Sequence, residues 1–169
     1  MEITHVNSEI LRFREIGSDD RWIDVKYFAY PGTGGNKDVL AALIANPWYD
    51  DDYASPSGAL PEPSRGLHGP YSLASIGVAS FSKVSARKSR ETVRVWAQSL
   101  GPLPDGFARK YDDLMVQLLG AASAIFQLSV LDASARHRWN GQLGATGFHE
   151  FVVISPASKT VALIVASDD

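Results

Sequence analysis

Hydrophobic and polar positions alternate with period two over residues 22–30, which is typical of a strand with two different faces. A polar turn cluster at residues 17–20 separates this segment from another apolar segment at residues 9–16. The two segments are therefore predicted to form an antiparallel hairpin. One face of the second strand carries Ile23, Val25, Tyr27 and Ala29, and the other carries Trp22, Asp24, Lys26 and Phe28.

The last third of the chain contains two short apolar runs, at residues 151–154 and 161–166, around a polar connection at residues 155–159. Both runs are rich in β-branched residues and too short to be independent helices, so they predict another hairpin. Neither run alternates cleanly, which is typical of strands that are covered on both faces. We expect this hairpin to lie inside a sheet.

Two helices are predicted from apolar residues at helical spacing. Residues 37–46 form a short amphipathic segment that follows Asn36, an N-cap candidate, and stops at Pro47. The second helix begins at Asp105 and is expected to continue to about Val130, although Gly120 costs about 1 kcal/mol relative to alanine. A break at Gly120, with a strand over residues 124–131, is the alternative. The seam consists of Phe107, Tyr111, Leu114, Leu118, Ala121, Ile125 and Leu128.

A middle hairpin is predicted from residues 73–84 and 91–99, where Thr92, Arg94 and Trp96 alternate with apolar residues. Its basic connection, residues 85–90, is interpreted as an exposed turn. The order is then hairpin, helix, hairpin, helix, hairpin. Because each helix must bury its apolar stripe, we expect an α+β fold: a mainly antiparallel six-stranded sheet with two helices packed on one face. Residues 1–169 are predicted to be one domain.

Residues 47–70 differ from the rest of the chain, because four prolines and three glycines fall within residues 54–70. A connection of this length in a compact domain is typically a functional lid or a disordered segment, and both alternatives stay open. Aromatic residues surround its acidic run, Asp50-Asp51-Asp52. Such rings are common where a loop closes on a ligand or a partner, whereas anchoring the loop to the core is the competing interpretation. The ligand-binding candidates here are Trp48, Tyr53 and His68.

Composition excludes several kinds of chemistry. The absence of cysteine removes disulfides, thiolate nucleophiles and Cys-ligated metals, and the net charge of −3 argues against a nucleic-acid partner. The start of the chain does not resemble a secretory leader, and no apolar run approaches the roughly 20 residues of a membrane span. We therefore expect a soluble cytoplasmic protein without a membrane partner.

The histidines offer the clearest acid–base chemistry. None is spaced as a metal-binding motif, so we expect no metal and no cofactor. His149, at the mouth of a central strand, is the first candidate for a general acid or base, and His137 is the second, with Tyr49 and Asp50 as further catalytic candidates. A structural histidine at a strand end is the competing interpretation. Three residues could form an anion clamp with a stacking surface: Arg136, Arg138 and Trp139.

Two functions follow from these features. The first is a small-molecule-binding protein, with cofactor-independent acid–base or positioning catalysis as a possibility, whose pocket is closed by residues 47–70. The second is a non-enzymatic interaction module, such as an immunity-type or antitoxin-like protein that occludes a protein partner. The first predicts a closed pocket lined by the candidate residues. The second predicts a filled core and an exposed patch made by Trp48, Tyr49 and Tyr53.

Overall fold

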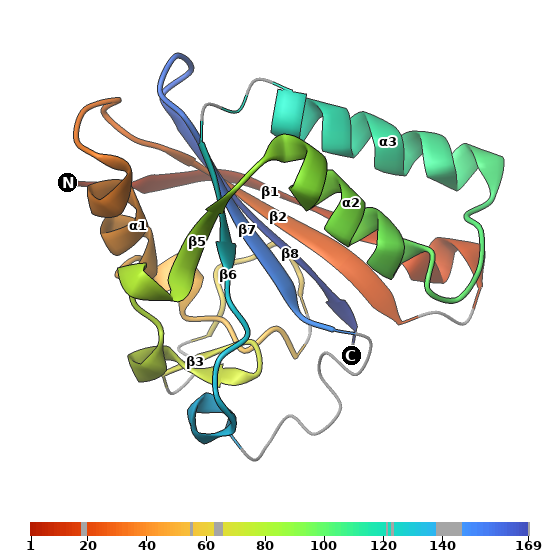
Figure 1. Cartoon of the computed structure of the whole chain (residues 1–169), viewed down its shortest axis with the longest axis horizontal. Helices are drawn as coiled ribbons and strands as arrows, with labels where there is room; N and C mark the ends of the chain where they lie inside the picture. The colour runs from red at the N-terminus through yellow and green to blue at the C-terminus, as the bar shows by residue number, and fades with distance from the viewer. Residues whose placement is uncertain are drawn as a thin grey trace.

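In the computed structural model, the described residues are 1–17, 20–54, 56–62, 66–120, 122, 124–137 and 147–168. They contain a six-stranded antiparallel sheet with the order β1-β2-β8-β7-β6-β5 and a small β3-β4 ribbon (Figure 1). The predicted α+β class and mainly antiparallel sheet are confirmed. The strands are β1 (Thr4–Arg12), β2 (Arg21–Ala29), β3 (Leu67–His68), β4 (Tyr71–Ser72), β5 (Phe81–Val84), β6 (Ala124–Leu128), β7 (His149–Ser155) and β8 (Thr160–Asp168), and the helices are α1 (Asn36–Ile44), α2 (Ala86–Ala97) and α3 (Asp105–Gly120).

The two terminal hairpins lie next to each other in the sheet, with β1 at its edge. Strands β1 and β2 pair as predicted, and β8 lies between β2 and β7. The C-terminal hairpin is therefore internal, as its unalternated apolar runs predict. Both faces of β8 are buried: Val161, Leu163 and Val165 belong to one core cluster, and Ala162, Ile164 and Ala166 belong to the other.

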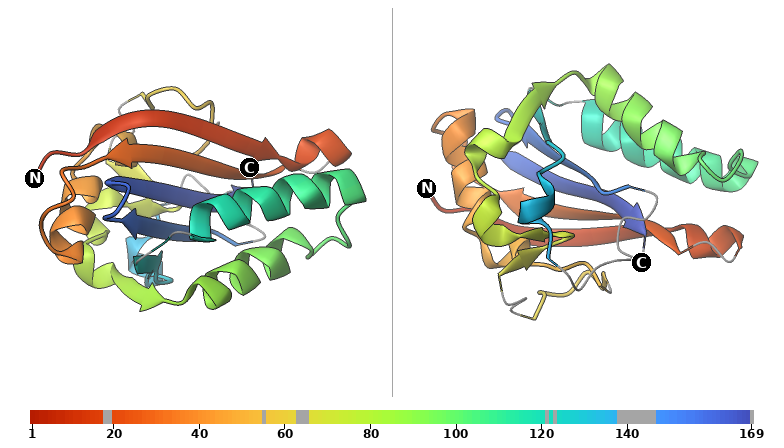
Figure 2. Two further views of the ribbon diagram at one scale, coloured as in Figure 1. Left: turned by 90° about the horizontal axis from the view of Figure 1, so that it is seen from above. Right: turned by 60° about the horizontal axis from the view of Figure 1, so that its bottom comes forward.

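Helices α2 and α3 lie side by side across one face of the sheet (Figures 1 and 2). Their buried side chains pack against residues of β2, β7 and β8 such as Ile23, Phe151 and Ile164. Two helices thus share one face, but they are not the predicted pair at residues 37–46 and 105–130. Helix α1 is not one of them, because Val39 and Leu40 pack into the core of the opposite face. That opposite face is completed by residues of the 47–80 segment.

The predicted strand at residues 91–99 is wrong, because this segment belongs to helix α2. The period-two pattern of Thr92, Arg94 and Trp96 suggests a strand. The residues that are buried instead recur at i, i+4, i+7 and i+8, which is the spacing of one face of a helix. The Ser85 side chain accepts a hydrogen bond from the Lys88 amide and caps the helix. The stripe consists of Ser89, Val93, Trp96 and Ala97.

The expected continuation of the last helix to Val130 is also wrong. Helix α3 ends at Gly120, and residues 124–128 form β6, which was the alternative. Glycine lowers helix stability. Beyond Gly120, the backbone of β6 forms its hydrogen bonds with β5 and β7 instead of within a helix. Strand β5 is shorter than predicted, because residues 73–75 and 78–80 form single 3₁₀ turns.

Within the described residues, no helix combines the length and apolar character that crossing a bilayer requires.

Candidate functional site

Two charged side chains of β2 point into the core on the face opposite α2 and α3. Trp22, Asp24, Lys26 and Phe28 occupy every second position of β2, so all four share that face of the strand. Only 1% of Asp24 and 2% of Lys26 is exposed. Burial of charged groups is costly unless they are paired, so their partners determine what this face can do.

Residues 47–53 supply the partners of Lys26. Its Nζ donates to Asp51 Oδ2 at 2.6 Å, to the Trp48 carbonyl at 3.2 Å and to Tyr53 Oη at 3.2 Å. The ammonium also lies 4.3 Å from the centroid of the Tyr53 ring, which stacks on Trp22. The ammonium therefore fixes the start of the long loop onto the sheet.

Asp24 is less well satisfied. Its Oδ2 lies 3.7 Å from Lys26 Nζ, and within the described part of the chain neither carboxylate oxygen has a hydrogen-bond partner. Burial raises the pKa of Asp24 to about 6, and the neighbouring Lys26 ammonium opposes this shift. Near neutral pH this carboxylate is therefore an incompletely compensated buried charge.

Glu150 of β7 joins the loop to the other end of the same face. Its Oε1 accepts a hydrogen bond from Tyr49 Oη at 2.8 Å, and its Oε2 lies 2.7 Å from His68 Nε2. The Tyr49 carbonyl can only accept, so His68 donates to it through Nδ1 at 2.5 Å. The Tyr49 and His68 rings also stack, with centroids 3.7 Å apart. Burial, followed by the Glu150 charge, raises the pKa of Tyr49 well above its usual value.

The charged residues of β2 and β7 and their partners in the loop form a group that we call the buried polar network. This network attaches the described part of residues 47–70 to the sheet. The Tyr49, Tyr53 and His68 side chains are all fully buried, Trp48 is half-buried and stacks on His5, and Asp50 is half-buried. The rings therefore fill the sheet face. The network consists of Asp24, Lys26, Tyr49, Asp51, Tyr53, His68 and Glu150.

Sequence reasoning did not select Asp24, Lys26 or Glu150 as site residues. The period-two pattern did place Asp24 and Lys26 on the same face as Trp22 and Phe28. A charged pair between two large aromatic residues is a signal of a buried, paired site. No comparable signal marked Glu150, because both its partners are in a distant loop.

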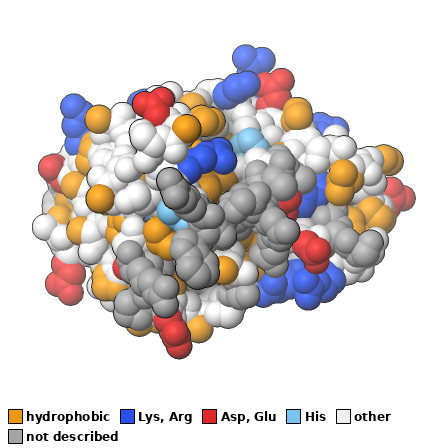
Figure 3. All heavy atoms as spheres, turned by 90° about the horizontal axis from the view of Figure 1, so that it is seen from below, with side chains coloured by type: hydrophobic (Ala, Val, Ile, Leu, Met, Phe, Trp, Pro, Cys, Tyr) orange, Lys and Arg blue, Asp and Glu red, His pale blue; other side chains and the backbone are white. Residues whose placement is uncertain are grey.

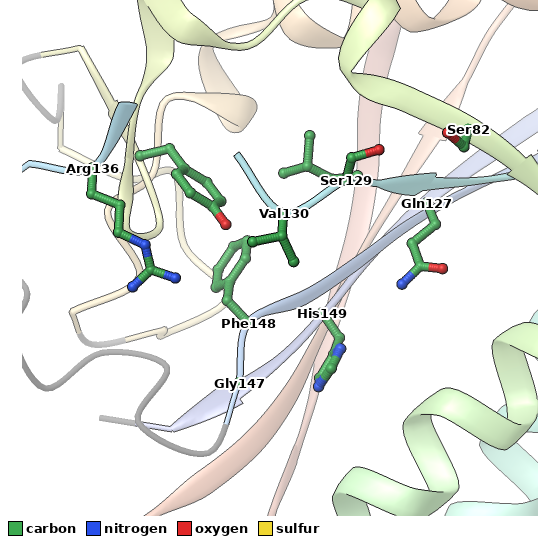
Figure 4. Close-up of a pocket in the computed structure, with 10 residues that line it drawn as sticks. Ser82, Gln127, Ser129, Val130, Arg136, Gly147, Phe148 and His149 are labelled. Atoms are coloured by element: carbon green, nitrogen blue, oxygen red, sulfur yellow. The ribbon is translucent and has the colours of Figure 1, made fainter. Parts of the chain in front are cut away.

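The structure contains a groove elsewhere, where β6 and β7 diverge. The pairing of these strands ends at Gln127 and Phe151, whereas the Ser129 amide donates a 2.9 Å hydrogen bond to the carbonyl of Ser80, the residue that precedes β5. The groove has a volume of about 340 Å³ (Figure 4). Its lining residues are Tyr71, Ser82, Gln127, Leu128, Ser129, Val130, Arg136, Gly147, Phe148 and His149.

Local backbone geometry positions the β7 side of this groove. Gly147 has φ +119°, and a Cβ at this position would lie 2.7 Å from His149 Nε2, so a larger residue would strain the backbone and displace the His149 ring. Its carbonyl accepts a hydrogen bond from Ser167 Oγ at 3.2 Å. Phe148 makes edge-to-face contacts with Tyr71 and His68. Through Phe148, the groove and the buried polar network share a wall.

The groove has a cationic end and a neutral polar end. Arg136 and Gln127 lie on opposite sides, with Phe148 and Val130 between them (Figure 4). The exposed Arg136 guanidinium lies 5.7 Å from the Tyr71 ring centroid. Burial lowers the pKa of His149, so its imidazole is neutral at neutral pH and can both donate and accept a hydrogen bond. In the described lining, no carboxylate opposes Arg136.

The groove therefore brings together only some of the predicted residues. Arg136 and His149 line it, whereas His137 lies beside it and contacts the Gly69 carbonyl at 3.2 Å through Nε2. Arg138 and Trp139 lie outside the described residues. The described residues contain no group of three or more histidine and carboxylate side chains arranged to hold a metal ion.

The side of the molecule that carries residues 47–70 has a mixed surface. Acidic and basic side chains are interspersed around it, and its visible hydrophobic side chains form small, separate patches (Figure 3). Tyr49 and Tyr53 do not contribute to this surface, because both are fully buried. The exposed three-ring patch expected for the interaction module is therefore not formed.

Comparisons with known proteins add little. No family model matches the chain, and no curated protein matches it closely enough to count as a relative. A crystal structure of citrus MAF1 aligns with 90% of this chain and 89% of its own, at 17% sequence identity and a TM-score of 0.36. A likeness this distant carries no functional argument.

Proposed function

We propose that this protein binds a small organic anion in the groove between β6 and β7. The observation that carries the proposal is the pairing of Arg136 with an aromatic and neutral polar lining that, in the described residues, contains no carboxylate. A guanidinium without a carboxylate partner favours a carboxylate or phosphate ligand. The volume of about 340 Å³ falls within the range of small-molecule sites.

The rest of the lining suggests the shape of such a ligand. Phe148 and Tyr71 offer ring surfaces beside Arg136, and Val130 extends the apolar part. Gln127, Ser129 and His149 supply hydrogen bonds at the other end. A ligand with an anionic head and a flat apolar body would use both ends. Any catalysis would fall to the neutral imidazole of His149, the only predicted general base in the described lining.

Phenyl phosphate and benzamide are a suitable probe pair, because both carry a ring but only phenyl phosphate is an anion. We expect ¹H–¹⁵N NMR titration with phenyl phosphate to shift the resonances of Phe148 and His149. Arg136→Gln should weaken binding by about tenfold, since it removes a charge-assisted hydrogen bond.

Lys83→Gln provides the matched control, because Lys83 is an exposed cation on β5 next to the lining residue Ser82. It should leave phenyl phosphate binding within about twofold, since it changes net charge without changing the groove. Equal binding of benzamide and phenyl phosphate, or equal effects of the two substitutions, would contradict the proposal.

An interaction module remains the second candidate, and the filled sheet face under residues 47–70 favours it. The half-buried Trp48 is the aromatic side chain of this segment that solvent reaches. If the protein occludes a partner through this segment, Trp48→Ala should abolish co-purification of that partner. Under the groove proposal, the same substitution leaves phenyl phosphate binding unchanged, which distinguishes the two functions.

A further inference from the structure

The groove passes through the sheet, because its lining residues come from both faces. Side chains alternate between the two faces of a strand, and both Ile125 of β6 and Phe151 of β7 belong to the core under α2 and α3. Gln127 and His149, two positions along these strands, therefore lie on the same helix-covered face. The His149 ring meets the ring of Trp96 on α2 edge to face, with centroids 6.4 Å apart.

The cationic end of the groove lies on the opposite face. Leu128 belongs to the core of that face, and Phe148 packs against the same core. Arg136 is held there by Tyr71, because the two residues form a β-bridge and the guanidinium lies 5.7 Å from the ring centroid. A ligand that uses both ends of the groove must therefore cross the sheet between β6 and β7 (Figure 4).

Strands β6 and β7 stop pairing with each other where this crossing begins. The last pair in their register is Gln127 and Phe151. Leu128 remains paired with β5 and His149 remains paired with β8, but in the described residues neither has a register partner across the gap. Alternate residues of an antiparallel strand direct their backbone N–H and C=O groups to opposite neighbours. Both edges of the gap therefore offer backbone hydrogen-bonding groups to a ligand.

We propose that the groove binds an N-acylated amino acid, a small anion that carries one carboxylate and one secondary amide. This inference rests on the proposed function, because Arg136 binds the carboxylate. A planar trans amide directs its N–H and its C=O in opposite directions, across the ligand chain. In a ligand that crosses the sheet, these groups point along the sheet toward β6 and β7, and they pair with strand edges as an added peptide strand does.

The remaining lining residues fit the other parts of this ligand class. Phe148 and Tyr71 offer ring surfaces to the amino-acid side chain next to Arg136, and the Gln127 amide meets the acyl end. A free amino acid fits less well, because its ammonium would lie near the Arg136 guanidinium and the described lining contains no carboxylate to compensate for it. Acylation removes that charge and creates the amide.

The test compares three ligands on the full chain by ¹H–¹⁵N NMR titration: N-acetyl-L-phenylalanine, N-acetyl-N-methyl-L-phenylalanine and L-phenylalanine. All three carry the ring and the carboxylate, but the N-methyl compound lacks the N–H donor and L-phenylalanine carries an ammonium. We expect N-acetyl-L-phenylalanine to bind about tenfold more tightly than either of the others, because each of them leaves a strand edge without its hydrogen bond. Its binding should shift the backbone resonances of Leu128 and Phe148 together, since they lie on the two edges.

Gln127→Leu should weaken the binding of N-acetyl-L-phenylalanine by about fivefold, because it removes a hydrogen bond to the acyl end. Gln98→Leu is the matched control, since Gln98 is an exposed residue at the end of α2 and does not line the groove. It should leave the binding within about twofold of the parent protein.

Equal affinities for the three ligands, or equal effects of the two substitutions, would overturn this inference. Phenyl phosphate then separates it from the proposed function. If phenyl phosphate still binds and requires Arg136, the groove is an anion site and only the preference for an N-acylated amino acid is wrong. If neither phenyl phosphate nor N-acetyl-L-phenylalanine binds, both proposals are wrong.

Discussion

His68 and Glu150 form a fully buried pair, with 2.7 Å between Nε2 and Oε2, although 82 positions separate them in the chain. The pair joins the long irregular segment to the central strand β7. Because Glu150 also accepts the Tyr49 hydroxyl, one carboxylate holds two residues of that segment. This relationship explains why a segment rich in proline and glycine is packed against the sheet.

Glu150→Ala is expected to lower the free energy of unfolding by about 3–5 kcal/mol, because it leaves the His68 and Tyr49 polar groups buried without a partner. Urea denaturation measures this change. Glu62→Ala is the control, since Glu62 is exposed, and it should stay within about 0.5 kcal/mol of the parent protein. A loss below 1 kcal/mol for Glu150→Ala would mean that the pair does not hold the segment.

Asp24 gives the protein an unusual pH dependence. Its folded-state pKa of about 6 exceeds the ordinary value of 3.8, so the folded state binds more protons between these values. The contribution of Asp24 to stability is therefore fully present below about pH 4, falls as the pH rises to about 6 and is constant above. A shift of roughly two pKa units corresponds to about 3 kcal/mol.

Asp24→Asn removes the buried charge and should raise the free energy of unfolding at pH 7.5 by about 1–3 kcal/mol, with a smaller effect at pH 4.5. Urea denaturation at a series of pH values measures it. Asp113→Asn, at an exposed position of α3, should show no such dependence. Destabilisation by Asp24→Asn at pH 7.5 would show instead that Lys26 requires this carboxylate.

Substitutions at Gly69 and Gly66 can distinguish the cost of backbone strain from the cost of a steric clash. Both have positive φ, +49° and +78°, but a Cβ at Gly69 would lie 2.3 Å from Cε2 of Phe148, whereas one at Gly66 meets nothing within 4 Å. Gly66→Ala should cost about 1 kcal/mol from strain alone. Gly69→Ala should cost more and should also weaken phenyl phosphate binding, since it displaces Phe148. Equal losses of stability in thermal unfolding would contradict this assignment.

His149 is expected to titrate below its ordinary pKa of 6.5, because burial disfavours the imidazolium. Its folded-state pKa is lowered, so its contribution to stability is present above pH 6.5 and is lost as the pH falls through the folded pKa. NMR titration of the imidazole resonances measures this directly. His149→Gln should remove this part of the pH dependence. A midpoint at or above 6.5 would show that a nearby group stabilises the charged ring.

Much of the sheet could be predicted from local patterns, because its strands alternate or remain apolar over four or more residues. Helix α2 could not, since Val93 and Ala97 are four residues apart and therefore fit a strand pattern and a helix pattern over so short a window. The buried polar network was only partly visible. The period-two pattern assigns Lys26 to one face of its strand. The sequence does not distinguish its partner Asp51 from the neighbouring carboxylates, because only the folded loop brings Asp51 to Lys26. Pairing across such distances depends on the fold.

The sheet order has a consequence for how the chain acquires its structure. Strand β2 pairs along its whole length with β8, so Arg21 lies opposite Asp168. A nascent chain therefore cannot complete its central ladder until the last strand has emerged from the ribosome. Contacts of such large sequence separation slow folding and leave the first hairpin exposed in the meantime. Ribosome-bound chains that end before residue 160 should remain sensitive to protease.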